Sequence, residues 1–242
     1  MEIKNSVAFV TGANRGLGRH FAAQLLDRGA AKVYAAARNP ATVDLPGVAP
    51  VRLDVTDPAS VAEAAAAAPD VTLLINNAGI STHTRLSDGD LANIRREMET
   101  HYFGTLEVSR ALAPKLAANG GGAILNILSI LSWIHLPDYG AYSAAKAAEL
   151  ALTNVLRQEL APSGIDVTAL HVGYMDTDMA DYVDPADKTD PAEVAAEALD
   201  GIQAGSFEVI ADARSRDVKA ALSGGLELLY PHVFADADAG AA

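Results

Sequence analysis

The sequence predicts an α/β fold built on a doubly wound parallel sheet, and three observations support this prediction. Short apolar runs alternate with longer helical patterns along the chain. Most of the runs are continuously apolar, which is typical of strands in a parallel sheet covered on both faces. A glycine-rich turn joins the first strand to the first helix. Strand–helix alternation with right-handed crossovers then gives a doubly wound sheet.

The expected strands and helices form one domain, residues 1–234. Asp57-Pro58 and Asp190-Pro191 are good helix starts, because in each a capping carboxylate precedes a proline in the first turn. The small, acidic residues 235–242 are expected to form a frayed tail. Strands are expected over residues 7–10, 32–37, 51–54, 71–76, 123–128, 166–170 and 207–211, and helices over residues 16–28, 57–67, 90–118, 139–161 and 191–204.

The composition argues against several classes of function. Half of the 242 residues are hydrophobic, which is enough for one sizeable core. The net charge of −13 argues against nucleic-acid binding, which needs a basic face. The absence of cysteine excludes disulfides and thiolate metal sites and favours a reducing cytoplasm, so we expect a cytoplasmic protein without a metal. We expect no membrane contact, because there is no signal pattern and no apolar run near the ~20 residues of a membrane helix.

The glycine-rich turn, Thr11-Gly12-Ala13-Asn14-Arg15-Gly16-Leu17-Gly18, follows the first strand directly. Its glycines let the backbone turn sharply and approach a pyrophosphate, whose charge would lie at the helix N-terminus. The G-x-x-x-G-x-G spacing differs from the better-known G-x-G-x-x-G, so an ordinary glycine-rich turn is the alternative. The position at the start of an α/β chain favours dinucleotide binding.

The end of the second strand distinguishes between two dinucleotides. A carboxylate about 20 residues after the loop would bind the ribose 2′-hydroxyl of NAD, whereas an arginine accommodates the 2′-phosphate of NADP. The sequence has Arg38 there and no carboxylate, and Arg15 in the loop can reach the same phosphate. Because guanidinium groups suit phosphate oxygens, we expect NADP(H) rather than NAD(H). The alternative is that both arginines are solvated surface charges.

Six motifs in order along residues 11–177 resemble those of the short-chain dehydrogenase/reductase family. The resemblance implies a Rossmann-type sheet of seven parallel strands, a nicotinamide cofactor, and interconversion of alcohols and carbonyl compounds. The motifs are the glycine loop, Asp54-Val55 at the adenine, the N-N-A-G motif of residues 76–79, Ser129, the Y-x-x-x-K pair Tyr142 and Lys146, and Gly173 with Thr177 at the nicotinamide amide. Together with Arg38, the expected cofactor-binding residues are Gly12, Asn14, Arg15, Gly16, Leu17, Gly18, Asp54, Val55, Asn77, Ala78, Gly79, Tyr142, Lys146, Gly173 and Thr177.

Tyr142 and Lys146 can handle protons together, because residues four apart on a helix lie on the same face. A nearby ammonium lowers the pKa of a phenol from about 10, which suits general acid–base catalysis. The resemblance implies that Tyr142 protonates the substrate oxygen, that Ser129 holds this oxygen, and that Lys146 also holds the nicotinamide ribose. Ser132 is the alternative serine. The cofactor would carry the hydride.

His101 departs from the family pattern. The family commonly has an asparagine in an N-x-x-G motif where this sequence reads His101-Tyr102-Phe103-Gly104. That asparagine is thought to bend its helix and to position a water that relays protons to the lysine. His101 can take over the relay, because histidine donates and accepts hydrogen bonds and titrates near neutrality. The alternative is a structural histidine with a weaker relay. A second departure is Val172, where a proline often precedes the glycine.

Apolar side chains close to the catalytic residues indicate the kind of substrate. A mostly apolar cleft with a few polar groups is the usual small-molecule site, so we expect an apolar ketone, aldehyde or alcohol of small to medium size. The alternative is that some of these side chains pack against a neighbouring subunit. The main pocket residues are expected to be Trp133, Tyr174 and Met179, with Ile134, Leu136, Pro137, Met175, Tyr182 and Val183 beside them.

The helix at residues 139–161 is apolar on nearly every side, and such a helix is normally buried all round. One face must meet the sheet, so we expect the other in a homodimer or homotetramer, as the resemblance also implies. Two other functions remain open. One is a catalytically weak NADP(H)-binding sensor or scaffold on the same fold. The other is an epimerase or dehydratase of the same superfamily, which would usually need a larger substrate domain.

Overall fold

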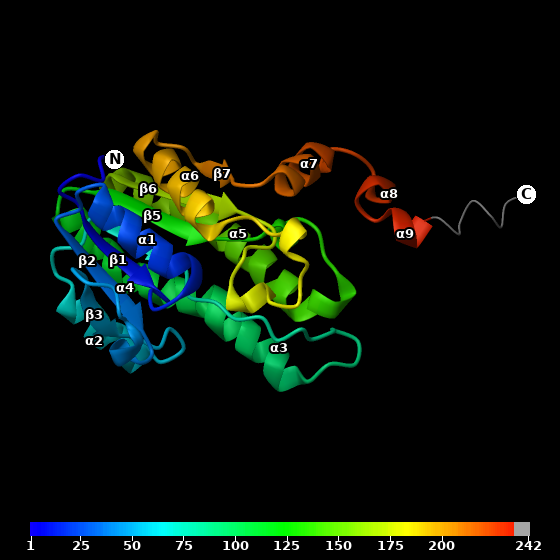
Figure 1. The fold of residues 1–242 in the computed structure, drawn as a ribbon, viewed down its shortest axis with the longest axis horizontal. Helices are drawn as coiled ribbons and strands as arrows, with labels where there is room; N and C mark the ends of the chain where they lie inside the picture. Colours follow the sequence, from blue (N-terminus) through cyan, green and yellow to red (C-terminus); the bar gives the residue numbers. More distant parts are fainter. Residues whose placement is uncertain (235–242) are drawn as a thin grey trace, which may run out of the picture.

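Within residues 1–234, which are those described by the computed structural model, seven parallel strands form one sheet (Figure 1). Their order, β3-β2-β1-β4-β5-β6-β7, confirms the predicted doubly wound sheet. The order reverses between β1 and β4, so the carboxyl ends of these strands open a crevice, the usual ligand site of such sheets. The strands are β1 (Val7–Thr11), β2 (Lys32–Ala37), β3 (Ala49–Arg52), β4 (Leu73–Asn76), β5 (Gly122–Ile127), β6 (Ile165–His171) and β7 (Glu208–Ile210).

The strands are apolar without alternation because both faces of the sheet are covered. Successive side chains of a strand point to opposite faces. In β1, Ala8 and Val10 therefore pack into one core, and Phe9 packs into the other. Helices α1 (Gly16–Asp27) and α6 (Pro191–Gln203) cover the first face and pack against each other.

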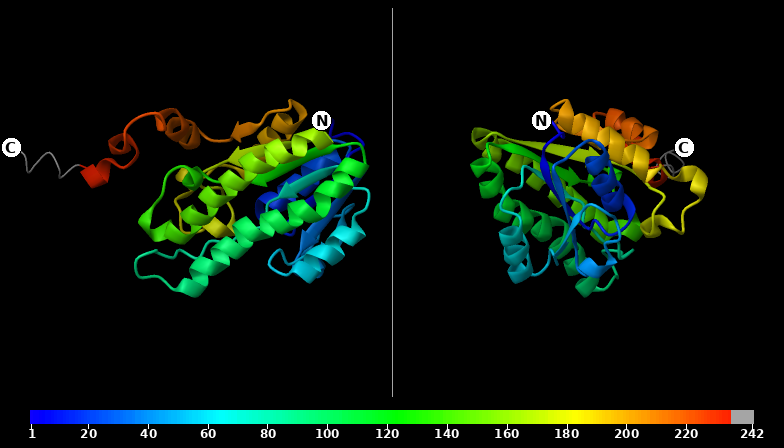
Figure 2. Two further views of the ribbon diagram at one scale, coloured as in Figure 1. Left: turned by 180° about the vertical axis from the view of Figure 1, so that it is seen from behind. Right: turned by 60° about the vertical axis from the view of Figure 1, so that its left-hand side comes forward.

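The opposite face is covered by α2 (Pro58–Ala67), α4 (Gly104–Ala118) and α5 (Gly140–Leu160). Figure 2 shows α4 and α5 running side by side across this face. The predicted capping devices are confirmed, because the carboxylates of Asp57 and Asp190 accept hydrogen bonds from the first turns of α2 and α6.

The prediction of one continuous α-helix over residues 90–118 was wrong. The segment consists of α3 (Leu91–Met98), a π-helical segment (Glu99–Phe103) and α4. The wider π-helical turn carries His101 inward, where its ring lies so close to Gly79 that a β-carbon there would meet Cε1 at 2.8 Å. Such turns are often found at functional sites.

The structure also differs from the predictions at one strand and in the C-terminal helices. The strand expected at 51–54 begins at Ala49 and ends at Arg52, because Asp54 instead accepts hydrogen bonds from Thr56 in the following turn.

The short, largely polar helices α7 (Ala213–Ala221), α8 (Leu226–Leu229) and α9 (Pro231–Phe234) were not predicted. They extend away from the sheet (Figure 1). The tail expected at 235–242 lies outside the described residues.

A buried polar bridge joins the sheet to the helices below the crevice. The amide of Asn76, at the end of β4, donates to Asn126 Oδ1 at 2.9 Å and to Ser109 Oγ at 3.0 Å. Asn126 in turn donates to Thr153 Oγ1 on α5 at 2.9 Å. These side chains are at most 4% exposed, so each depends on the others for its hydrogen bonds.

His171, the last residue of β6, anchors the loop that follows β5. Its ring is fully buried, with Nδ1 lying 3.1 Å from Ser132 Oγ and 3.3 Å from the carbonyl oxygen of Ser129. Trp133 stacks on the ring at a centroid distance of 3.7 Å. Burial lowers the pKa of His171 to about 4, so the ring is neutral at physiological pH.

We expect Asn76→Ala to lower the free energy of unfolding by about 2–4 kcal/mol, because it leaves buried acceptors on Ser109 and Asn126 without their donor. Urea denaturation at pH 7 measures the loss. Asn154→Ala, at an exposed position of α5, is the control. A loss below about 1 kcal/mol for Asn76→Ala would show that the bridge does not stabilise the sheet.

We expect the neutral ring of His171 to make the fold sensitive to acid. The unfolded chain binds this proton below a pKa of 6.5 and the folded chain only below about 4, so stability present above pH 6.5 is lost as the pH falls through that window. The loss would approach roughly 3 kcal/mol. Urea denaturation between pH 7 and 4, with His171→Gln as reference, isolates the effect. Equal pH slopes for both proteins would contradict it.

Candidate active site

A cleft of about 1010 Å³ lies along the carboxyl ends of the central strands. It brings together nearly all of the residues that the sequence predicted for the site. Gly18 instead packs beneath the glycine loop, because a β-carbon there would lie 2.3 Å from the carbonyl oxygen of Gly12. The predicted residues that line the cleft are Gly12, Asn14, Arg15, Gly16, Leu17, Arg38, Asp54, Val55, Asn77, Ala78, Gly79, His101, Ser129, Tyr142, Lys146, Gly173, Tyr174, Thr177 and Met179.

The glycine loop leaves the first turn of α1 open to a ligand. Gly12 and Gly16 have φ of +65° and +51°, which favour glycine. Within the described chain, Arg15 precedes α1 without a side-chain capping hydrogen bond, and the first turn holds no acidic residue. By contrast, aspartates cap α2, α3 and α6. The free N–H groups of α1 therefore fit the pyrophosphate of a dinucleotide.

The segment after β4 clamps this loop in place. Thr11 Oγ1 accepts hydrogen bonds from the backbone N–H groups of Asn77 and Ala78, each at 2.9 Å. The Asn77 amide donates to the carbonyl oxygens of Thr11 at 2.9 Å and of Gly12 at 3.3 Å. The two loops therefore form one rigid wall of the cleft.

The end of β2 forms the rim of the cleft where an adenosine ribose would lie. Arg38 is exposed there beside Asn39 and Thr42. Arg15 lies in the glycine loop, and its guanidinium pairs with Asp178 at 2.8 Å across the cleft. Both partners are exposed, so this pair adds little stability and leaves Arg15 free to bind a phosphate.

Ser129, Tyr142 and Lys146 come together where β5 and α5 meet. The Ser129 hydroxyl lowers the pKa of the neighbouring Tyr142 phenol and accepts a hydrogen bond from the N–H of Leu131 at 3.1 Å. Lys146 Nζ lies 5.7 Å from the centre of the Tyr142 ring. It donates to the carbonyl oxygen of Ile127 and to Glu149 Oε2, both at 2.7 Å, which leaves one N–H directed elsewhere.

The pKa of Tyr142 differs from the sequence-based expectation. Burial raises it, and the nearby Lys146 ammonium lowers it as expected. Glu149 and Glu97 raise it, so that the phenol titrates above its ordinary value. Burial lowers the pKa of Lys146, but the charges of Glu149, Tyr142 and Glu97, together with the hydrogen bond to Glu149, raise it above its ordinary value.

His101 stands beside this group with two acidic neighbours that sequence reasoning missed. Its ring meets the Tyr142 ring edge to face at 5.2 Å. Glu97 and Glu149 lie on either side of it, and all three side chains are at most 2% exposed. The spacing of Glu97 four residues before His101, and of Glu149 three residues after Lys146, is a signal that could have identified both acids.

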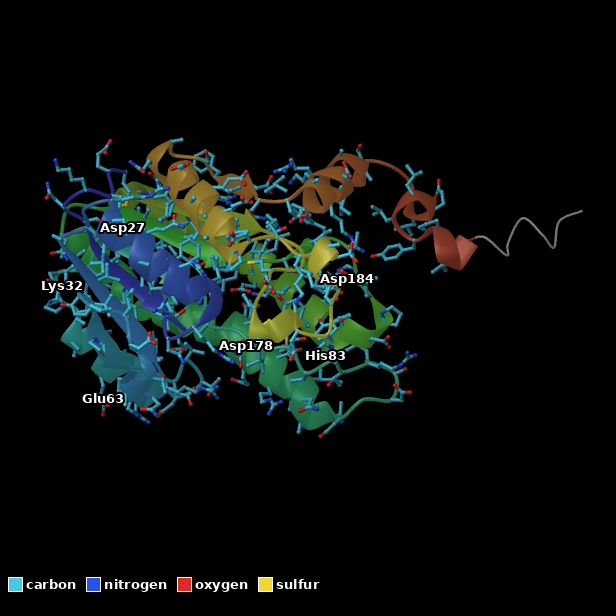
Figure 3. All side chains as sticks on the ribbon, viewed as in Figure 1. Asp27, Lys32, Glu63, His83, Asp178 and Asp184 are labelled. Atoms are coloured by element: carbon cyan, nitrogen blue, oxygen red, sulfur yellow. The ribbon has the colours of Figure 1, made fainter. Side chains whose placement is uncertain are left out.

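Aromatic side chains enclose the substrate end of the cleft. His83 packs against Tyr139 and Tyr182 at centroid distances of 5.0 and 4.9 Å, and the two phenols lie 2.9 Å apart. Burial, followed by a hydrogen bond with Tyr139, raises the pKa of Tyr174 to about 12. Figure 3 shows His83 near the segment that carries Asp178 and Asp184, and residues 177–182 of this segment line the cleft.

The prediction of Trp133 as a pocket residue was wrong. Its ring is turned away from the cleft, stacked between His171 and the ammonium of Lys219. Sequence proximity to Ser129 suggested the pocket, but the chain forms a short helical turn over Ile130–Ser132, so neighbouring side chains point in different directions. Ile130, Leu131, Ile134 and Leu136 face the cleft instead.

Among residues 1–234, no group of three or more acidic, histidine or cysteine side chains is arranged to hold a metal ion. None of the helices described there is both long and apolar enough to cross a membrane.

Comparison with known proteins agrees with this geometry. The family model of the short chain dehydrogenases matches residues 6–188. The mouse dehydrogenase/reductase SDR family member 7B is 35% identical over 195 residues, which cover 74% of this chain and 60% of that protein. An NADPH-dependent 1-acyldihydroxyacetone phosphate reductase from Schizosaccharomyces pombe is 32% identical over 73% of this chain and 62% of its own length. The chain thus spans about 60% of the length of these relatives.

Solved structures show the same arrangement. A short chain dehydrogenase from Burkholderia cenocepacia, in complex with NADP, superposes with a TM-score of 0.91 at 41% identity, covering 96% of this chain and 98% of that one. A short chain dehydrogenase/reductase from Burkholderia phymatum, in complex with NAD, gives 0.81 at 25% identity over 90% and 93%. The chain therefore belongs to the short-chain dehydrogenase/reductase family.

Proposed function

We propose that this protein is an NADP(H)-dependent oxidoreductase that interconverts a ketone or aldehyde and the corresponding alcohol. The observation that carries the proposal is the meeting of Ser129, Tyr142 and Lys146 in the same cleft as the uncapped N-terminus of α1. The cleft can hold a dinucleotide along one wall and a second small molecule beside the phenol. The bound cofactor would supply or accept the hydride.

The catalytic roles follow from the contacts. Ser129 holds the substrate oxygen next to Tyr142, because both side chains line the same part of the cleft and the serine lowers the pKa of the phenol. Tyr142 donates a proton to this oxygen in reduction and removes one in oxidation. Burial raises the pKa of the phenol, and Glu149 and Glu97 add to this, so that it can serve as the proton donor in reduction. Lys146 keeps one N–H for the cofactor ribose.

Arg38 supports NADP(H) as the cofactor. It is exposed at the end of β2 with no carboxylate beside it on the strand, so it can bind a 2′-phosphate. The Burkholderia cenocepacia structure contains NADP, and the yeast relative is named as NADPH-dependent. The Burkholderia phymatum structure contains NAD, so the family alone does not decide the preference.

The lining of the cleft supports an apolar substrate. Ile130, Leu131 and Ile134 line it on one side, and Tyr174 and Met179 line it on the other. The yeast relative is named for reducing an acylated dihydroxyacetone phosphate, a ketone that carries an acyl chain. A ketone with an apolar chain is therefore the substrate class to test first.

We also propose that the protein assembles as a homodimer or homotetramer through α4 and α5. The outer face of α5 presents Ala144, Ala151 and Val155 to solvent, and Phe103 lies exposed at the start of α4. Exposed apolar side chains grouped on adjacent helices are typical of subunit interfaces. The cytoplasmic location expected from the composition stays a prediction.

We expect Tyr142→Phe to lower kcat for carbonyl reduction by a factor of about 10²–10⁴, because the phenol proton is lost. Consumption of NADPH across a panel of apolar ketones and aldehydes measures this. The affinity for NADPH should change by less than about threefold. Tyr34→Phe is the matched control, because it removes a phenol hydroxyl that donates to Asp70 far from the cleft.

The same panel distinguishes the enzyme from a sensor or scaffold. Tight NADPH binding without turnover of any compound would favour the sensor. Turnover that survives Tyr142→Phe unchanged would overturn the assigned mechanism.

We expect Arg38→Asp to weaken NADPH binding about 10- to 100-fold, because a charge-assisted contact with the 2′-phosphate is replaced by repulsion. Binding of NADH, which lacks this phosphate, should weaken much less. Fluorescence titration with both dinucleotides measures the ratio, and Arg95→Asp on the exposed side of α3 is the control. An unchanged ratio would show that Arg38 does not select the cofactor.

A further inference from the structure

A second serine and a buried histidine hold the backbone of Ser129. The carbonyl oxygen of Ser129 accepts hydrogen bonds from the N–H of Ser132 at 2.9 Å and from the Ser132 hydroxyl at 2.6 Å. Ser132 Oγ lies 3.1 Å from Nδ1 of His171, and the same nitrogen lies 3.3 Å from the carbonyl oxygen of Ser129. All three residues are at most 7% exposed. These contacts form a buried chain from His171 through Ser132 to Ser129.

The hydroxyl proton of Ser132 determines which ring nitrogen of His171 is protonated. A carbonyl oxygen only accepts hydrogen bonds, so the hydroxyl proton of Ser132 points to the carbonyl oxygen of Ser129. Nδ1 of His171 then faces two oxygens that offer it only lone pairs, and it must therefore be the donor. Because burial lowers the pKa of His171 to about 4, the ring is neutral and Nε2 carries no proton. His171 is therefore the Nδ1–H tautomer.

The surroundings of Nε2 agree with this tautomer. Among residues 1–234, Nε2 of His171 has no hydrogen-bond partner. Glu208 Oε1 lies 3.6 Å away, which is too far for a hydrogen bond, and this oxygen already accepts one from Lys219 Nζ at 2.9 Å. Buried N–H groups without an acceptor are rare in proteins. A proton on Nδ1 rather than on Nε2 avoids such a group.

Stacking fixes the plane of the histidine ring. Trp133 lies on the ring of His171 at a centroid distance of 3.7 Å and an interplanar angle of 18°. Lys219 Nζ in turn lies 4.8 Å from the centre of the Trp133 ring. The imidazole cannot rotate without displacing the indole, because protein interiors are closely packed. Nδ1 therefore stays directed at Ser132.

The same turn sets the position of the Ser129 hydroxyl. Ser129 is the N-cap residue of the helical turn Ile130–Ser132, and its Oγ accepts a hydrogen bond from the N–H of Leu131 at 3.1 Å. This hydrogen bond uses a lone pair of Oγ, so the hydroxyl proton of Ser129 can be donated into the cleft that Ser129 lines. If the turn opened, the hydroxyl would lose the N–H that holds it. The position of the hydroxyl therefore depends on the hydrogen bonds that Ser132 makes.

We infer that His171 is a positioning residue for the reaction, because its Nδ1–H holds, through Ser132, the turn that directs the Ser129 hydroxyl toward the substrate oxygen. The inference rests on the proposed function, in which Ser129 holds this oxygen. The ring of His171 is fully buried and does not line the cleft, so it touches neither substrate nor cofactor. Its effect is therefore on turnover of the carbonyl substrate and not on the affinity for NADPH.

Two substitutions of His171 separate this role from packing. The amide nitrogen of asparagine is as many bonds from Cα as Nδ1 of histidine, and that of glutamine is as many bonds away as Nε2. His171→Asn can therefore still donate to Ser132, whereas His171→Gln cannot. We expect kcat/KM for carbonyl reduction to fall less than about threefold in His171→Asn and about 10-fold or more in His171→Gln. The affinity for NADPH should stay within about twofold in both.

A packing role predicts the opposite order of the two variants. Glutamine fills more of the buried site than asparagine does, so His171→Gln would then be the milder change. Equal losses of kcat/KM in the two variants, or a larger loss in His171→Asn, would overturn the inference.

Ser132→Ala is a second variant that leaves the histidine site filled. It breaks the chain of hydrogen bonds in the middle and should lower kcat/KM about as much as His171→Gln. Thr168→Val is the matched control, because Thr168 is 2% exposed on the same strand as His171 and donates a hydrogen bond to the carbonyl oxygen of Ser206 at 2.8 Å. It should lose similar stability in urea and keep kcat/KM within about twofold. An equal loss of activity in Thr168→Val would attribute the effect to destabilisation and overturn the inference.

A double-mutant cycle separates failure of this inference from failure of the proposed function. In the background of Ser129→Ala, His171→Gln should lower kcat/KM no further, because no hydroxyl remains to be positioned. Additive losses would overturn the positioning role of His171. Full activity of Ser129→Ala alone would instead overturn the role of Ser129 in the proposed function.

The tautomer can be measured on the protein without substrate. The ring ¹⁵N signals of His171, assigned by their loss in His171→Asn, should show a protonated Nδ1 and a bare Nε2 at pH 7. A proton on Nε2 would overturn the inference, because Nδ1 of the neutral ring could then only accept a hydrogen bond.

Discussion

The buried positive charge of Lys146 is the constraint on which the rest of the site depends. An isolated ammonium in a protein interior costs several kcal/mol, and this one is 6% exposed. It is held by a carboxylate on its own helix and by the carbonyl oxygen of Ile127 at the end of β5. The ammonium of Lys146 is therefore stabilised jointly by the end of β5, which supplies the Ile127 carbonyl, and by Glu149 on α5.

The groups that stabilise the Lys146 ammonium also affect the pKa of Tyr142. The ammonium favours the ionised phenol, whereas burial and the two acids favour the neutral phenol, and the neutral form prevails. A carboxylate that keeps the lysine charged thus also limits how far the lysine can activate the tyrosine. The His101 ring lies between the acids. The pKa of Tyr142 is therefore set by Glu149 and Glu97 as well as by Lys146.

The sequence predicted the strands of the sheet and the residues that meet in the cleft, because these predictions depend on short-range patterns. The glycine loop, Arg38 at a strand end and the four-residue step from Tyr142 to Lys146 need no knowledge of distant contacts. Trp133 was misplaced because a short helical turn follows Ser129, and closeness in sequence does not say to which side a residue of such a turn points. Glu97 was missed because its partner His101 turns inward only through a π-helical segment that periodicity does not reveal. Helices α7 to α9 were missed because they are short and largely polar and carry little of the apolar pattern that identifies a helix.

The uncapped start of α1 also links ligand binding to folding. Helices α2, α3 and α6 begin with an aspartate that pairs one of their first N–H groups, whereas the first turn of α1 has no such partner within the described chain. A dinucleotide phosphate would complete this helix as a cap, and a ligand that binds the folded chain at a hundred times its Kd adds about 2.7 kcal/mol of stability. The thermal stability of the protein would then follow the dinucleotide concentration around it, which makes the cofactor a structural part of the fold as well as a reagent.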